Sequence, residues 1–133
     1  MATKKTSEET VIEMRKPYAV WTVKDEDYHL KLTTATVIDL EEQYGKNLLD
    51  LLGDGMPPLK QMLDITHKAL QKYHHGIRRA DVNDMFDDYL ENGGSQMEFF
   101  STVYIDTFTV SGFFSEKMAA EMRKSMEEAA KEL

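Results

Sequence analysis

The hydrophobic period of this sequence changes once, near Thr33, and that change constrains the fold more than any other feature. Before it, Tyr28, Leu30 and Leu32 alternate with polar residues, which is the pattern of a half-buried β-strand. After it, apolar residues recur about every 3.6 positions, which is the period of an amphipathic helix. We therefore expect an α+β, mainly α fold, with an N-terminal β-hairpin followed by about five helices in one compact domain, the last helix being amphipathic.

The expected hairpin spans residues 18–32. A β-branched and aromatic run that includes Trp21 forms its first strand. The acidic residues 25–27 interrupt this run, so we place the turn there. Residues 1–15 are polar and are expected to form a flexible lead-in, which leaves residues 16–133 as a single domain.

Residues typical of helix ends mark the boundaries of the expected helices. Thr33 or Thr34 can cap the first helix, and Gly45 follows it at a position that favours positive φ. Pro58 suits the first turn of a longer helix. The expected helices, one of them a single short turn, span about residues 34–44, 47–52, 58–75, 81–91, 96–110 and 115–133.

The segment 97–110 is the hardest to assign, because two signals disagree. Its β-branched and aromatic residues favour a strand by propensity. Its length favours a buried helix, with Ser95 able to cap it and Glu98 at the capping-box position. We predict a helix, with a strand as the alternative.

Composition excludes several classes of function. The 133 residues include no cysteine, which removes disulfides, zinc–thiolate centres and thiol catalysis and agrees with a reducing cytoplasm. A net charge of −8 argues against nucleic-acid binding, which needs clustered basic residues. No apolar run approaches the roughly 20 residues of a membrane-spanning helix, and the first residues lack the apolar stretch of a secretory signal. We expect a cytoplasmic protein with neither nucleic acid nor membrane as partner.

Two groups of side chains resemble metal ligands, and we interpret both as solvated. His67 and His74 are two helical turns apart, about 10 Å along the axis, which is too far for one zinc ion to bridge. Asp81, Asp84 and Asp88 share one helix face and would suit Mg²⁺. However, no glycine-rich phosphate loop accompanies them. We therefore expect no metal, no cofactor and no enzymatic activity.

Charge is unevenly distributed along the chain. No Lys or Arg occurs between Ala80 and Glu116, whereas basic residues crowd the preceding segment. Separate zones of opposite charge can support head-to-tail self-association, giving a homo-oligomer, or docking on a charged partner. The residues expected to make such contacts are Lys68, Lys72, Arg78 and Arg79 in the basic zone and Asp81, Asp84 and Asp88 in the acidic zone.

The last expected helix carries an apolar stripe that is rich in methionine. Methionine is flexible and polarizable, and it is common at surfaces that bind varied apolar partners. The alternative is that the stripe packs on the core, as most amphipathic helices do. We favour the core for the first two methionines and partner binding toward the end of the helix. The stripe consists of Met118, Met122, Met126, Ala129 and Leu133.

Three segments of the chain resemble the tail assembly chaperones of long-tailed phages and prophages of Gram-positive bacteria. They are YHLKLTTATVIDLEEQYGKNLLDLL at 28–52, the helix from Pro58 with DVNDMFDDYLENGG at 81–94, and SGFF at 111–114. The resemblance implies an assembly factor in the host cytoplasm that holds the tape measure protein soluble and recruits tail tube subunits onto it. It also implies that the protein is absent from the finished particle, and it supplies no catalytic residues.

Two other classes of function are compatible with the sequence. One is a structural phage protein that stays in the virion, such as a head–tail connector or a tail completion subunit. The other is a small metal-dependent enzyme built on the acidic face between Asp81 and Asp88.

Overall fold

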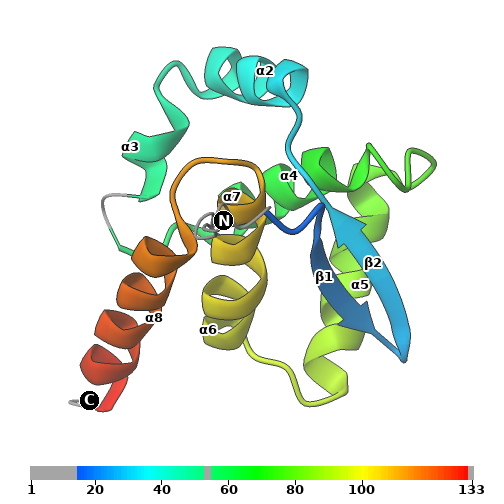
Figure 1. Ribbon diagram of the computed structural model, residues 1–133. Helices are drawn as coiled ribbons and strands as arrows, with labels where there is room; N and C mark the ends of the chain where they lie inside the picture. The colour runs from blue at the N-terminus through cyan, green and yellow to red at the C-terminus, as the bar shows by residue number, and fades with distance from the viewer. Residues whose placement is uncertain (1–14, 53–54, 132–133) are drawn as a thin grey trace, which may run out of the picture.

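The structure, a computed structural model, describes residues 15–52 and 55–131, and it confirms the α+β, mainly α class. A β-hairpin comes first, and every later element is helical (Figure 1). After the hairpin come the helices α2 (Thr34–Tyr44), α3 (Leu48–Leu52), α4 (Leu59–Leu70), α5 (Arg79–Glu91), α6 (Gln96–Glu98), η1 (Phe99–Tyr104), α7 (Ile105–Val110) and α8 (Glu116–Lys131). The expected lead-in, apart from Arg15, lies outside the described residues.

The hairpin pairs β1 (Ala19–Val23) antiparallel with β2 (Glu26–Leu30). Its turn is Lys24-Asp25, with φ of 53° and 66°, which is the left-handed geometry that tight hairpin turns require. The turn expected at residues 25–27 is therefore wrong by one to two positions. Glu26 and Asp27 instead belong to β2. Their side chains lie at the exposed end of this strand, where a charged side chain keeps its contact with water.

Local capping signals place the ends of α2 as expected. The hydroxyl of Thr33 accepts a hydrogen bond of 3.3 Å from the backbone N–H of Thr36. Gly45 has a φ of 69°, and its N–H donates to the carbonyl of Glu41. These contacts satisfy backbone groups at both ends that the helix itself leaves unpaired.

The ends of α4 and α5 differ from the expected ones. α4 ends at Leu70 instead of continuing to residue 75, because the following N–H groups of Gln71 and Tyr73 bond to carbonyls three residues back. α5 begins at Arg79, two residues early, and Arg78 is its N-cap, with its backbone N–H donating to the carboxylate of Asp81.

At the start of α4, Pro58 is the N-cap rather than the first helical residue. Its ψ of 149° is extended. The helix therefore begins one residue later than the sequence pattern indicates.

The segment 97–110 is helical, so the prediction of a helix over a strand is confirmed. The hydroxyl of Ser95 accepts from the N–H of Glu98, as expected of an N-cap. In the middle, residues 99–104 widen into a π-helix, which the sequence does not indicate. Residues 103–110 are all buried, which explains why no polar stripe marks this helix in the sequence.

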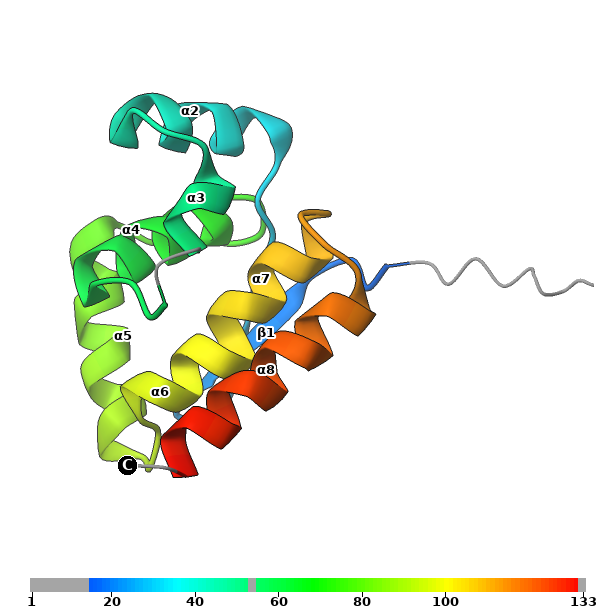
Figure 2. The same cartoon turned by 90° about the vertical axis from the view of Figure 1, so that its left-hand side faces the viewer.

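Trp21 on β1 is the largest fully buried side chain of the core. The rings of Tyr89 and Phe99 pack against it edge to face, with centroids 5.9 Å and 5.1 Å away. The helix from α6 to α7 lies between the hairpin and α8, and α2 stands at the opposite end of the molecule from the last turns of α8 (Figure 2). In the ranges that the structure describes, no helix is both long enough and apolar enough to cross a membrane.

A glycine next to this aromatic cluster gives a direct test of the packing. A Cβ on Gly94 would overlap the ring of Tyr89, so Gly94→Ala should lower the free energy of unfolding by about 1–3 kcal/mol, the usual cost of overpacking. Gly76→Ala is the matched control, because Gly76 has open space and no positive φ. Urea denaturation measures both variants, and equal midpoints for the two would contradict this arrangement.

Candidate binding site between two helices

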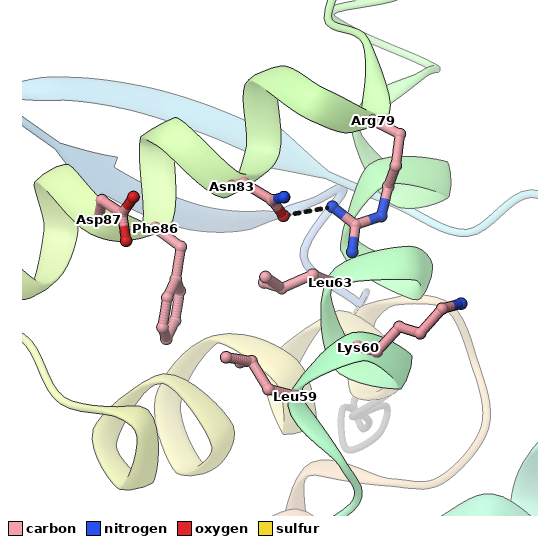
Figure 3. Close-up of a pocket in the computed structure, with 7 residues that line it drawn as sticks. All are labelled: Leu59, Lys60, Leu63, Arg79, Asn83, Phe86 and Asp87. Carbon is pink, nitrogen blue, oxygen red and sulfur yellow. Dashed lines mark hydrogen bonds between the residues drawn. The ribbon is translucent and has the colours of Figure 1, made fainter.

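An open pocket of about 560 Å³ lies where α5 turns away from α4 (Figure 3). Leu59 and Leu63 from α4 face Phe86 from α5 and form its apolar wall. The polar side chains at its edges are Lys60, Arg79, Asn83 and Asp87.

Helical spacing explains why these residues share the pocket. On α4, Leu59 and Leu63 are four residues apart and therefore lie one above the other on one face. On α5, Arg79, Asn83 and Asp87 repeat at the same interval. The pocket thus has an apolar row on α4 and a polar row on α5, and Lys60 and Phe86 complete its lining.

Asp64 on α4 holds three elements together beside the pocket. Its Oδ2 accepts hydrogen bonds from the hydroxyl of Tyr44 on α2, at 2.9 Å, and from Lys60 Nζ, at 2.8 Å. Its Oδ1 accepts from Arg79 Nε on α5 at 2.7 Å. Arg79 in turn donates from Nη1 to the Oδ1 of Asn83 at 2.7 Å, so the guanidinium is fixed at the pocket edge. We call Asp64 and these three donors the Asp64 cluster.

The electrostatics of the Asp64 cluster favour an ionised carboxylate. Burial alone would raise the pKa of Asp64, but the three hydrogen bonds that it accepts outweigh burial and hold that pKa below its ordinary value. Burial and the hydrogen bond to Asp64 raise the pKa of Tyr44, which therefore stays protonated. At neutral pH two cations share one anion, so this edge carries a net positive charge.

The sequence does not single out Asp64 as a site residue. Its partners lie 20 residues before it and 15 residues after it, so no local spacing connects them. One feature of the sequence could have indicated it: Asp64 stands between the apolar residues Leu63 and Ile65, and both of these are buried. A charge in such a position is rarely left without a partner.

The structure distributes the expected charge-zone residues among several internal contacts. Arg78 and Asp81 pair with each other at 3.0 Å, and Asp88 lies 3.4 Å from Lys24 of the hairpin turn. Arg79 belongs to the Asp64 cluster. Of the remaining members, Lys72 lies over the ring of Tyr73, Lys68 is half-buried on α4, and Asp84 is exposed on α5.

The methionine stripe of α8 divides. Met122 packs against the core as expected, but Met118 is 52% exposed, so its expected core position is wrong. Ala119 is fully buried and fills the contact instead, because a small side chain lets the helix approach closely. The side chains of Met126 and Ala129, and all of Leu133, lie outside the described residues.

Arg123, which the sequence does not mark as a contact residue, attaches α8 to the helix that runs from α6 to α7. Arg123 Nε donates to the backbone carbonyl of Ser101 at 2.7 Å, and its Nη2 lies 3.5 Å from Asp106 Oδ1. Ser101 belongs to η1 and Asp106 to α7, so one side chain spans both parts of that helix.

The expectation that the histidines are solvated is wrong for two of them, His67 and His74. His74 Nε2 accepts a 2.9 Å hydrogen bond from the backbone N–H of His29, which ties β2 to the turn after α4. His67 Nε2 lies 3.1 Å from the carbonyl of Ile77. Burial lowers the pKa of His74, and nearby His29 lowers it further, with an opposing effect from Glu26.

Among residues 15–52 and 55–131, no group of three or more His, Cys, Asp or Glu side chains could hold a metal ion.

We expect the variant Asp64→Asn to lower the free energy of unfolding by about 1.5–3 kcal/mol, because it weakens hydrogen bonds to a charged group. The folded pKa of Asp64 is depressed, so its contribution is present above the ordinary pKa of about 4 and is lost as pH falls below it. Chemical denaturation at neutral and acidic pH measures the difference. The control is Asp84→Asn on the exposed face of α5. A constant deficit at every pH would contradict the assignment.

His74 should make stability depend on pH near neutrality. Its folded pKa is depressed, so as pH falls below about 6.5 the unfolded chain binds the proton first and stability declines. We expect His74→Asn to be less stable at neutral pH but to lack this decline, whereas the exposed control His75→Asn retains it. Thermal unfolding from about pH 7.5 to about pH 5 spans the titration of histidine. Parallel pH profiles for wild type and His74→Asn would refute this.

Comparison with known proteins identifies a family. No match was found among curated proteins or among solved structures. One family model, described as a family of unknown function (DUF6096), matches residues 14–133. This range includes the hairpin, the pocket between α4 and α5, and α8. The chain therefore belongs to the DUF6096 family.

Proposed function

We propose that the protein is a non-enzymatic assembly factor of the phage tail assembly chaperone type. It binds the tape measure protein, recruits tail tube subunits onto it, and acts in the cytoplasm of the bacterial host without entering the mature virion. The proposal starts from the sequence resemblance over the hairpin, α2–α5 and the SGFF segment. Its main structural support is the open apolar pocket between α4 and α5.

A second open pocket adds to this support. It has a volume of about 370 Å³ and lies between α2 and the end of α7. Ile38 and Leu49 at this pocket are 50% and 46% exposed. Concave apolar surfaces suit the capture of an apolar helical client. The net charge of −8 on this chain favours its solubility while those apolar surfaces are exposed.

The state of the ionisable groups beside the larger pocket also favours binding over catalysis. A general base works best with a pKa near the working pH. Asp64 is instead held ionised by two cations and a tyrosine hydroxyl, and these contacts occupy both of its oxygens. The cluster therefore positions side chains and offers no free base to a substrate.

Co-expression with the tape measure protein encoded by the same phage or prophage tests the proposal. We expect a soluble complex that co-elutes on size exclusion, and a tape measure protein that aggregates when expressed alone. A client that is equally soluble alone, or the absence of a complex, would refute it. Mass spectrometry of purified particles separates the alternative, because a connector or completion subunit stays in the virion and a chaperone does not.

A further inference from the structure

The pocket between α4 and α5 is electrically polarised along its length. Lys60 and Arg79 lie at one edge and Asp87 at the other, on either side of the apolar wall (Figure 3). Arg79 and Asp87 are eight residues apart on one helix, which is about 12 Å along its axis. An occupant that lies along α5 therefore meets positive charge first and negative charge about two turns later.

The cationic edge can accept a further carboxylate without losing its internal contacts. Lys60 is 80% exposed on its side chain, and one carboxylate oxygen of Asp64 holds it. The side chain of Arg79 is 33% exposed, and its hydrogen bonds to Asp64 and Asn83 use Nε and Nη1, so among the described residues no hydrogen bond occupies Nη2. Two cations around one anion leave this edge with one uncompensated positive charge.

The apolar wall between the two charged edges requires an apolar side chain in the middle of the occupant. Leu63 and Phe86 are almost fully buried, while Leu59 is half-buried at the mouth. An aliphatic side chain seated here would cover the exposed part of Leu59 and remove apolar surface of both partners from water. Nucleic acid is a poor occupant, because Asp87 and the net charge of −8 repel phosphate.

We propose that this pocket binds an amphipathic helical segment of the client that presents an acidic residue, a leucine-sized side chain about one turn later, and a basic residue about two turns after the acidic one. The acidic residue pairs with Lys60 and Arg79, the aliphatic side chain packs on Leu59 and Phe86, and the basic residue pairs with Asp87. This inference rests on the proposed function for the identity of the client. The order of the two charges fixes the direction in which the client helix lies along α5.

Two synthetic helical peptides of identical composition serve as probes. One carries glutamate, leucine and lysine at the proposed spacing, and the other carries the lysine next to the glutamate, so that in neither direction along α5 can its two charges reach both edges of the pocket. Fluorescence anisotropy with the full chain should show at least roughly tenfold tighter binding of the first peptide, the effect of about 1.4 kcal/mol from matched charge pairs. Equal binding of the two peptides, or no binding of either, would overturn the proposal.

Charge variants at the two edges locate the binding site. Asp87→Lys changes an exposed side chain outside the Asp64 cluster, so it should weaken the first peptide while circular dichroism stays unchanged. Lys60→Gln removes the charge of Lys60 but keeps an N–H donor for Asp64, so it should also weaken the first peptide. The matched controls are Asp84→Lys and Lys72→Gln, because they make the same charge changes outside the pocket. An equal loss with the control variants would show that net charge alone governs binding.

The same variants separate this inference from the proposed function. If wild type, Lys60→Gln and Asp87→Lys all bind the tape measure protein equally well, the pocket assignment fails and the chaperone function stands. If the peptides bind with the expected order but the tape measure protein does not, the pocket assignment stands and the client is a different helical protein.

Discussion

The arrangement of α2, α4 and α5 depends on one carboxylate. Asp64 accepts hydrogen bonds from Tyr44 on α2, from Lys60 on its own helix and from Arg79 on α5. Apolar burial supplies the larger part of stability in a domain of this kind, but it is not directional. Hydrogen bonds to a partly buried charge are directional, so the Asp64 cluster favours one packing of these helices. The position of Arg79, and with it the cationic edge of the pocket, follows from that choice.

Local signals in the sequence predict most of the fold. Thr33 and Gly45 bound α2 through contacts within a few residues, and such contacts are readable from spacing alone. Small errors of one or two residues occur at local caps such as Pro58 and Arg78, and larger ones occur where contacts distant in sequence are involved. The chain leaves α4 early, at Leu70, and His74 a few residues later bonds to the hairpin 45 residues away. The π turn at 99–104 is likewise absent from the sequence pattern.

The binding site is less predictable than the fold for the same reason. The sequence points to runs of charge and to the methionine stripe, both of which are features of adjacent residues. The pocket instead depends on Asp64 and Arg79, which meet across 15 residues. Exposure is also a property of tertiary packing: Met118 and Ala119 are neighbours on α8, yet the methionine faces solvent and the alanine is buried.

The helix at 103–110 has a consequence for how the chain can diverge. Every one of its residues is buried, and the hydroxyls of Thr107 and Thr109 donate to backbone carbonyls one turn back instead of to water. An amphipathic helix such as α5 can exchange residues on its wet face at little cost. This helix has no such face, so a substitution at any of its positions requires a compensating change in a neighbouring element. We therefore expect the sequence of this helix to change less over evolutionary time than the sequences of the surface helices.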